Sequence, residues 1–344
     1  MKINSLELTN FKGIANIRFE FEGKSVVFFG INGVGKSSIL RSINLLYSSI
    51  INRIVKNRFK QGIKIASSDI STGASTCSIN AEFKFSNKFA IEYSRSMEKK
   101  NAKYTHNSKA LDSISKYFEQ EYSDAYTNVP IFVNYGVNRL VLDIPLRIKT
   151  RHIFDREAAF EKAIENHIDF RTFFEWFRHQ EDFENQKKVR EKKSYEDASL
   201  KAVRIAIKNM FDGFDHLRIE RNPLSMKINK GAITLSVDQL SDGEKCTLAL
   251  IGDLARRLSL ANPSRKNPLL GEGVVLIDEI ELHMHPAWQR KILPKLRKTF
   301  PHIQFIITTH SPQVLGEVGD DFNLFSLSID NGEIEYTKIG PVIV

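Results

Sequence analysis

A short glycine-rich segment limits what this chain can fold into more than any other feature. Residues 30–37 read G-I-N-G-V-G-K-S and match the pattern G-x-x-x-x-G-K-[ST]. An apolar run at residues 26–29 precedes the segment, and residues 38–49 carry apolar side chains at helical spacing. The order of strand, glycine loop and helix predicts a loop that wraps phosphate groups. An ordinary glycine turn with an exposed lysine is the alternative, and the flanking elements argue against it.

The residue types of this loop suit a triphosphate and a magnesium ion. Glycines let backbone N–H groups point inward, and the N-terminus of the following helix adds favourable positive potential. The Lys36 ammonium is expected at a catalytic position between the β- and γ-phosphates, and the Ser37 hydroxyl is expected to bind Mg²⁺. The predicted nucleotide contacts are Gly30, Ile31, Asn32, Gly33, Val34, Gly35, Lys36, Ser37 and Ser38.

Two later apolar runs end in polar residues that suit the same site. Residues 274–277 lead into Asp278 and Glu279, and residues 305–307 lead towards His310. Strand tips gather ligands in open α/β sheets. We expect Asp278 to hold Mg²⁺ through water, Glu279 to orient or deprotonate the attacking water, and His310 to donate a hydrogen bond to the γ-phosphate. Plain strand exits and a structural histidine are the alternatives.

The segment L-S-D-G-E-K at residues 240–245 opens an amphipathic helix predicted over residues 240–260. Serine hydroxyls are common N-caps, and here the capping residue is Ser241, while Gly243 permits close backbone approach. An ordinary capped helix would explain the same residues. Further along, His283 and His285 could suggest a metal site, but no additional ligand pattern accompanies them and loop structure is the favoured interpretation.

The composition is that of an ordinary globular protein, with 42% hydrophobic and 26% charged residues among 344. The net charge of +9 is compatible with a polyanionic partner without establishing one. No apolar run approaches the roughly 18 residues of a membrane span, and the N-terminus lacks the apolar core of a signal peptide. The two cysteines, Cys77 and Cys246, have no metal-site spacing. We therefore expect a soluble, cytoplasmic protein without a membrane partner.

The order of the patterns divides the chain into three predicted regions. Residues 1–150 form an N-terminal lobe with the phosphate loop and a β-hairpin, residues 151–215 form a charged helical insertion, and residues 216–344 form a C-terminal lobe. Strands alternate with helices in the last region, which predicts a largely parallel sheet covered on both faces.

Several local patterns carry weaker expectations. The polar residues 97–108 suggest a mobile loop, and residues 286–299 suggest one helix. The charged run at residues 181–197 is interpreted as a solvated helical face, with a lever or partner-docking insertion as the alternative. A basic cluster consists of Arg53, Lys56, Arg58, Lys60 and Lys64.

Together these motifs resemble the SMC/RecF-like class of ABC-type ATPase heads. The opening L-T-N-F-K-G at residues 8–13 looks like the first strand and N-F-K turn of that class, which lies near the adenine. Residues 240–245 are similar to the signature L-S-x-G-E-K, residues 278–283 to Walker B with its D-loop, and residues 309–312 to the switch histidine. The resemblance implies an α/β ABC-type ATPase head, with a P-loop NTPase parallel sheet, an N-terminal antiparallel β subdomain and a helical insertion.

The same resemblance implies a composite site that uses ATP and Mg²⁺. In that class the signature helix of one subunit caps the ATP held by the phosphate loop of another. Ser241, Gly243 and Glu244 are therefore expected to contact nucleotide held by a partner copy, and Lys12 is expected near the adenine of its own chain. A homodimer or a higher even-numbered oligomer follows from this arrangement.

Within the class, two stretches look most like bacterial antiphage defence ATPases of the Septu and retron systems. These are D-E-I-E-L-H-M-H-P at residues 278–286 and N-Y-G at residues 134–136, followed by Arg139. Such ATPases work with an HNH nuclease and, in retrons, with a reverse transcriptase and its DNA product, which implies nuclease and nucleic-acid partners. The chain has no clear Q-loop glutamine, and Tyr135-Gly136 stands at its expected place. We find no nuclease motif in the chain itself.

Three alternatives remain open. A RecF-like DNA repair and recombination ATPase would bind DNA directly, through the basic cluster, in a salt-dependent manner. An ATP-binding subunit of a membrane transporter is disfavoured by the N-F-K opening and the acidic signature. A scaffold that binds ATP without hydrolysing it would be separated from the leading hypothesis by an ATPase assay.

Overall fold

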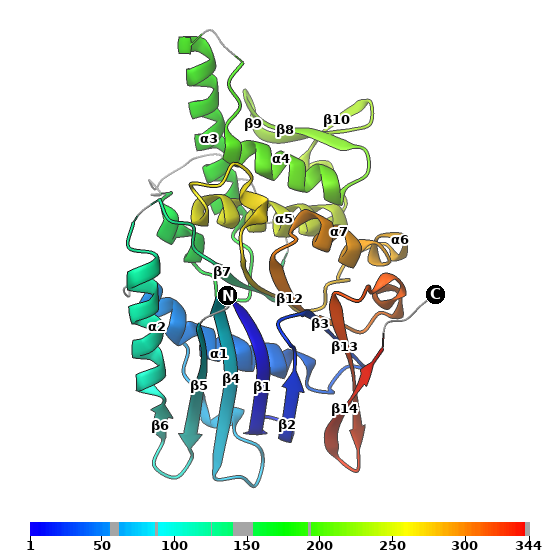
Figure 1. Cartoon of the computed structure of the whole chain (residues 1–344). Coiled ribbons are helices and arrows are strands. Elements are labelled where there is room, and N and C mark those ends of the chain that lie inside the picture. Colours follow the sequence, from blue (N-terminus) through cyan, green and yellow to red (C-terminus); the bar gives the residue numbers. More distant parts are fainter. Residues whose placement is uncertain (56–61, 87–88, 125, 140–153, 192–193, 341–344) are drawn as a thin grey trace.

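In the computed structural model, the strands of the described residues form three sheets that are joined by helices (Figure 1). The residues described are 1–55, 62–86, 89–124, 126–139, 154–191 and 194–340. Most of the basic cluster, namely Lys56, Arg58 and Lys60, lies outside them. Arg53 lies inside, and its guanidinium pairs with Asp112 at 3.4 Å.

The central sheet has six strands in the order β14-β13-β3-β12-β11-β7. Its strands are parallel except β14, which is antiparallel to β13. Strands β7, β11 and β12 are buried along their whole length, as expected for apolar runs covered on both faces. The six are β3 (Ser25–Phe29), β7 (Ile131–Tyr135), β11 (Gly273–Ile277), β12 (Ile303–Thr309), β13 (Phe322–Asp330) and β14 (Glu333–Ile339).

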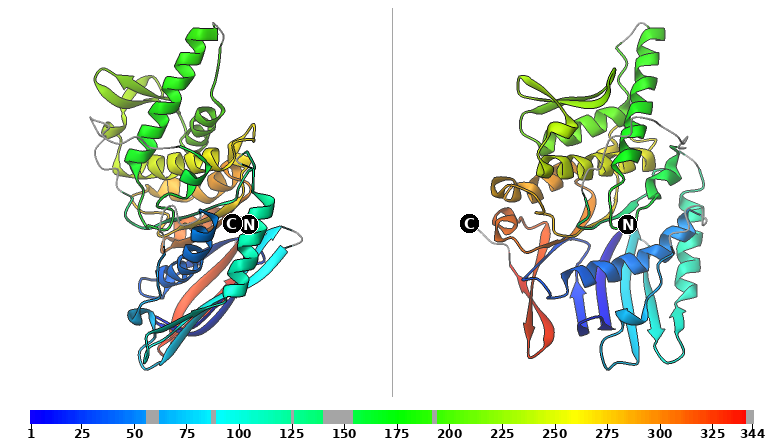
Figure 2. Two further views of the ribbon diagram at one scale, coloured as in Figure 1. Left: turned by 90° about the vertical axis from the view of Figure 1, so that its left-hand side faces the viewer. Right: turned by 180° about the vertical axis from the view of Figure 1, so that it is seen from behind.

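A second, antiparallel sheet comes from the N-terminal part of the chain, with the order β2-β1-β4-β5-β6. Figure 2 shows helix α1 (Lys36–Ile54) crossing one face of this sheet. Phe19 lies 5.1 Å from Phe28 and 5.3 Å from Phe325 between ring centroids, so aromatic packing joins this sheet to the central one. The strands are β1 (Lys2–Phe11), β2 (Ile14–Glu20), β4 (Thr76–Ser86), β5 (Phe89–Glu98) and β6 (Lys103–His106).

The third sheet, with the order β10-β9-β8, lies beside the helices of the predicted insertion. Figure 1 shows α3 projecting away from the two larger sheets, with α4 and α5 beneath it. These elements are α3 (Phe170–Glu191), α4 (Ala198–Met210), α5 (Asp242–Ala261), β8 (Phe214–Arg221), β9 (Leu224–Lys230) and β10 (Ile233–Ser236). The short 3₁₀ helices are η1 (Ser67–Asp69), η2 (Arg156–Phe160), η3 (Val237–Gln239), η4 (Pro268–Leu270) and η5 (Pro312–Glu317).

The expected α/β architecture, a parallel sheet with an antiparallel N-terminal subdomain, is confirmed, but three local expectations were wrong. The segment 97–108 contains β6 and leads into helix α2 (Ser108–Glu121), where the Asn107 side chain accepts a 3.1 Å bond from the Ala110 N–H. The single helix over residues 286–299 is two, α6 (Pro286–Gln289) and α7 (Ile292–Thr299). Pro294 lacks a backbone N–H and therefore fits only in the first turn of a helix. A separate helix, α7, consequently begins at Ile292.

The third correction concerns the charged run at residues 181–197. Its side chains are not all solvated, because Glu181 and Glu184 are only 5% and 1% exposed. Arg204 lies 3.4 Å from the Glu181 carboxylate and 3.1 Å from that of Glu184, and Arg221 lies 2.7 Å from Glu181. These ion pairs bind α3 to α4 and β8, which satisfies the buried charges.

Among the described helices, none is long and apolar enough to cross a bilayer.

Candidate functional site

The glycine loop lies between β3 and α1, as the sequence predicts. Lys36 is buried, and its Nζ donates hydrogen bonds to the carbonyl oxygens of Gly30 at 2.7 Å and Ile31 at 2.8 Å. Gly35 caps α1 with φ at +86°, a backbone conformation that residues other than glycine rarely adopt. Burial lowers the pKa of Lys36, while the carboxylates of Glu279, Glu281 and Asp278 oppose that shift. The loop therefore curls around an ammonium group that faces three acids.

The remaining predicted contacts belong to the same loop and to the first turn of α1. The Val34 side chain is buried at 1% exposure, and the Ile31 side chain is 74% exposed. Gly30 is buried like Val34, whereas Asn32, Gly33 and Ser37 are exposed like Ile31. The predicted contacts follow one another along the loop and the first turn of α1: Gly30, Ile31, Asn32, Gly33, Val34, Gly35, Ser37 and Ser38.

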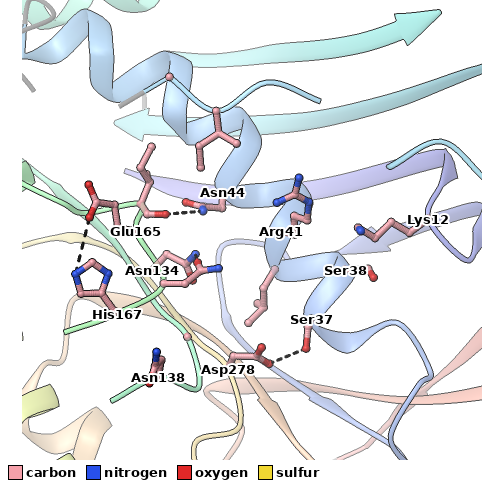
Figure 3. Close-up of a pocket in the computed structure, with 16 residues that line it drawn as sticks. Lys12, Ser37, Ser38, Arg41, Asn44, Asn134, Asn138, Glu165, His167 and Asp278 are labelled. Atoms are coloured by element: carbon pink, nitrogen blue, oxygen red, sulfur yellow. Dashed lines mark hydrogen bonds and ion pairs between the residues drawn. The ribbon is translucent and has the colours of Figure 1, made fainter. Parts of the chain in front are cut away.

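The two predicted magnesium ligands meet at the tips of neighbouring elements. The Ser37 hydroxyl donates a 3.2 Å hydrogen bond to Oδ1 of Asp278, which follows β11 (Figure 3). The Thr308 hydroxyl donates a 2.5 Å bond to the same oxygen. Mg²⁺ takes oxygen ligands and is usually held by one or two protein groups together with phosphates and water. Among the described residues, no three His, Cys, Asp or Glu side chains form a metal cluster. The donors fit Mg²⁺ bound jointly with phosphate.

Glu279 has an unusual backbone conformation, with φ at +48°. A non-glycine residue in this region costs about 1–3 kcal/mol and persists only where its surroundings hold it. Its N–H donates a 2.8 Å hydrogen bond to the Thr308 hydroxyl. The carbonyl oxygens of Asp278 and Glu279 both accept hydrogen bonds from Nη2 of Arg139, at 2.8 Å for Asp278. The turn after β11 is therefore fixed from two sides.

His310 follows β12 and is held by an acid that the sequence did not single out. Its Nδ1 lies 2.9 Å from Oε1 of Glu281, and its backbone N–H donates a 2.7 Å bond to the same oxygen. Glu281 is 4% exposed, whereas the His310 side chain is 47% exposed. The sequence signal that could have identified Glu281 is its place as the third acid in the stretch D-E-I-E at residues 278–281. Glu281 contacts Nδ1 and thereby orients the imidazole, which leaves Nε2 available to a ligand.

Lys12 lies at the edge of the site in the turn after β1, with φ at +52°. Its Nζ is 3.2 Å from Oδ1 of Asp69, and the Asp69 carboxylate also receives two hydrogen bonds from Arg41, at 2.9 and 2.8 Å. Burial alone would raise the pKa of the Asp69 carboxyl, but the bonds from Arg41, the Ala66 N–H and Lys12 outweigh burial and lower it. Lys12 is thus part of a structural ion-pair cluster beside the site.

A pocket of about 740 Å³ opens beside α1 and continues from the Ser37–Asp278 pair (Figure 3). Most of the residues that line it carry polar side chains, and they come from the turn after β1, from α1, from residues 62–63, from the end of β7 and the segment after it, from residues 164–167 and from Asp278. The segment after Tyr135-Gly136, where no glutamine was found, places the amide of Asn138 in this wall. Polar lining residues include Lys12, Arg41, Asn44, Asn134, Asn138 and His167.

The predicted signature lies in a different pocket, of about 420 Å³. Ser241 caps α5, and Glu244 reaches back to the Ser241 N–H at 2.9 Å, forming a capping box. Gly243 is needed because a Cβ there would lie 2.1 Å from the carbonyl oxygen of His283. The walls comprise Ser241, Asp242, Gly243, Glu244, His283, His285 and Trp288, and they include no phosphate-loop residue.

The two histidines of this pocket serve the local fold. His283 adopts φ at +62°, and His285 caps α6 by accepting a 3.2 Å bond from the Ala287 N–H. Loop structure, the favoured interpretation, agrees with these contacts.

Cys77 and Cys246 are both buried free thiols.

Comparison with known proteins places the chain in a family. Residues 25–316 match the family model described as "AAA domain, putative AbiEii toxin, Type IV TA system". The "Retron Ec83 probable ATPase" of Escherichia coli is 31% identical over 396 residues, covering 97% of this chain and 72% of that protein. The "Retron Vc95 probable ATPase" of Vibrio cholerae serotype O1 biovar El Tor is 29% identical, covering 92% and 72%. The "Septu protein PtuA" of Bacillus mycoides (strain KBAB4) is 28% identical, covering 90% and 38%.

Solved structures agree on the fold. A crystal structure of an SMC head bound to the C-terminal winged-helix domain of ScpA superposes with a TM-score of 0.59 at 15% identity, covering 99% of this chain and 98% of that one. The SMC head domain from Thermotoga maritima gives a TM-score of 0.54 at 18% identity, covering 99% and 100%. With its phosphate loop, the chain belongs to the AAA-domain family that it matches and is an ATPase with the fold of SMC heads.

Proposed function

We propose that two copies of this chain bind ATP head to tail, hydrolyse it, and thereby control a partner nuclease in antiphage defence. The observation that carries the proposal is the separation of the two halves of the site. Ser37 and Asp278 line one pocket, whereas Ser241 and Gly243 line another. A second copy would complete each site, with the signature of one chain facing the phosphate loop of the other.

Each residue has a proposed task in that assembly. The Lys36 ammonium and the N–H groups of the loop would hold the phosphates, and the Glu279 carboxylate would orient or deprotonate the attacking water. The Glu281-oriented His310 would donate a hydrogen bond to the γ-phosphate. Mg²⁺, held by Ser37 and Asp278, would supply positive charge that offsets the charge of the β- and γ-phosphates.

ATP would drive association because its γ-phosphate contacts both copies in the closed state only. A ligand shifts such an equilibrium by its difference in affinity between the states. Hydrolysis removes those contacts, so the closed pair would loosen. Ile31, exposed on the phosphate loop, would become covered when the copies meet.

The proposed defence role comes from the relatives, whose names identify them as retron and Septu proteins. We infer that the partner is an HNH nuclease and, in a retron setting, also a reverse transcriptase with its DNA product. The helical insertion, which we assign to residues 151–215, is the proposed docking element because α3 projects from the body of the molecule (Figure 1). Co-purification with the products of neighbouring genes would test this part.

The hydrolysis proposal is tested with Glu279→Gln. This variant should retain ATP and slow hydrolysis by about two to three orders of magnitude, the effect of losing a positioned general base. Glu333→Gln, an exposed change on β14, is the matched control and should leave the rate unaltered. Turnover at the wild-type rate in Glu279→Gln would refute the assignment.

A further inference from the structure

We propose that Arg139 is a positioning residue, which holds the Glu279 turn in the conformation required for hydrolysis. The inference rests on the proposed function, because it takes Glu279 as the group that acts on water. Arg139 is the last described residue before position 154, and it reaches the site from the end of β7. It contacts the turn through backbone atoms and acts on the reaction through Glu279.

The first observation is how the polar backbone groups of the turn are satisfied. The Asp278 N–H bonds to the Tyr135 carbonyl at 2.9 Å, and the Ile280 N–H bonds to the Thr308 carbonyl at 3.1 Å. The strands on either side therefore take up N–H groups of the turn. The Asp278 carbonyl instead accepts a hydrogen bond from Nη2 of Arg139, and the Glu279 carbonyl accepts from the same Nη2 and from the Leu282 N–H at 3.0 Å.

The second observation is the burial of that donor. Arg139 is 3% exposed, so the Asp278 carbonyl would not regain full hydration without it, whereas the Glu279 carbonyl would keep the bond from the Leu282 N–H. A buried carbonyl that loses its partner favours any rearrangement that restores a hydrogen bond. For this turn, rearrangement means moving Glu279.

The third observation is the left-handed backbone of Glu279, at φ +48°. The ordinary right-handed region is more favourable for a residue with a side chain, so the turn relaxes towards it when its supports are removed. A change in φ at Glu279 swings its Cβ and carboxylate relative to Ser37 and Asp278. Arg139 opposes this change by binding the carbonyls on both sides of the Glu279 N–Cα bond.

Charge adds to the same effect. Burial lowers the pKa of Arg139, while Cys246 and the carboxylates of Asp278, Glu281 and Glu279 raise it. The guanidinium is thus surrounded by acids of the site and offsets part of their mutual repulsion. A neutral side chain at position 139 would lose the hydrogen bonds and this charge together.

The test compares Arg139→Met and Arg139→Lys with the wild-type chain. Arg139→Met should lower kcat for ATP hydrolysis by about 10- to 100-fold, the usual effect of losing a group that orients a reacting residue, with KM changed by less than about threefold. Arg139→Lys should recover part of kcat, because it restores the charge and one donor. Arg156→Met is the matched control, since Arg156 also donates to backbone carbonyls, those of Tyr122, Asp124 and Thr127, away from the site.

A double variant separates positioning from a general structural role. If Arg139 acts through Glu279, Arg139→Met should slow the residual hydrolysis of Glu279→Gln by less than about twofold. The inference would be overturned if the losses in kcat from the two single variants multiplied in the double variant. A wild-type kcat in Arg139→Met, or an effect of that variant on KM alone, would also overturn it. Wild-type turnover in Glu279→Gln alone would instead refute the proposed function, and the inference with it. Should Arg139→Met fail to fold, Arg139→Lys gives the same comparison.

Discussion

The hydroxyl of Tyr135 donates a 2.8 Å hydrogen bond to Oδ2 of Asp253, joining the end of β7 to the middle of α5. Asp253 also binds Arg256 and Arg257, each at 2.7 Å, and all four side chains are buried. Burial alone would raise the pKa of the Asp253 carboxyl, but the two arginines lower it well below its ordinary range. The Tyr135 carbonyl accepts a 2.9 Å hydrogen bond from the Asp278 N–H of the Walker B turn, and α5 begins with the signature. This network therefore connects the two halves of the proposed site.

The first prediction concerns this hydrogen bond. Tyr135→Phe should reduce the free energy of unfolding by about 1.5–3 kcal/mol, the range for hydrogen bonds to charged groups. The ring stays in place, so packing is preserved and the loss reports the hydroxyl. Urea denaturation followed by circular dichroism measures it, with the slope against urea concentration unchanged.

Tyr47→Phe provides the control for that measurement. The Tyr47 hydroxyl is buried and finds no hydrogen-bond partner among the described residues. Removing an unsatisfied buried hydroxyl should leave stability unchanged or raise it slightly. Equal losses in the two variants would contradict the importance of the Tyr135–Asp253 bond.

Much of the geometry of the candidate site could be predicted because its residues follow local patterns. A glycine loop after an apolar strand identifies Lys36 and Ser37, and an apolar run ending in acids identifies Asp278 and Glu279. A parallel sheet then brings these residues together, since β3, β11 and β12 present the same ends at one edge of the sheet. The strand order, in which β3 lies between β12 and β13, was not predicted, because these strands are not consecutive along the chain.

The supporting residues could not be predicted in their roles, because their partners lie far along the chain. Arg139 bonds to carbonyls about 140 residues later, and Glu281 bonds to His310, 29 residues away. No periodic pattern encodes such pairs. Strand β6 was missed for a different reason, because residues 97–108 are polar and suggested a loop. No helix was predicted over residues 108–121, although Asn107 is a good cap and the buried side chains of α2 have helical spacing.

The second prediction concerns the close packing of the signature against the D-loop. Gly243→Ala should destabilise the fold by about 1–3 kcal/mol, as expected for overpacking, because the new Cβ would lie 2.1 Å from the His283 carbonyl oxygen. Alanine has the higher helix propensity, so a loss must come from this contact. Thermal unfolding measures the effect. Gly316→Ala is the control, because a Cβ added at Gly316 would have no neighbouring atom within 4 Å. An equal change in thermal stability of the two variants would refute the explanation.

The third prediction is a pH dependence of stability from Asp69. Its pKa is lowered from the ordinary value of 3.8 in the folded chain, so its contribution is complete above the unfolded pKa and is lost as pH falls through the folded one. The stability difference between the wild type and Asp69→Asn should be constant from about pH 6 to 8 and should shrink below about pH 4. Denaturation midpoints at stepwise pH values measure it. A difference that grows in acid would contradict the sign of the shift.

The fourth prediction tests whether two copies share each site. Lys36→Met removes the phosphate-binding ammonium, and Ser241→Arg blocks the signature surface with a long charged side chain, so neither variant should hydrolyse ATP alone. In a head-to-tail pair of unlike variants, one site combines the intact phosphate loop of one copy with the intact signature of the other. Equal mixing makes half of the pairs unlike, each with one working site of two, so the activity should recover to about a quarter of wild type. The measurement is ATP hydrolysis before and after mixing at matched total concentration, with Lys36→Met mixed into itself as the control. A mixture no more active than its components would show that the two surfaces do not meet across a pair, because any productive contact between an intact loop and an intact signature must restore turnover.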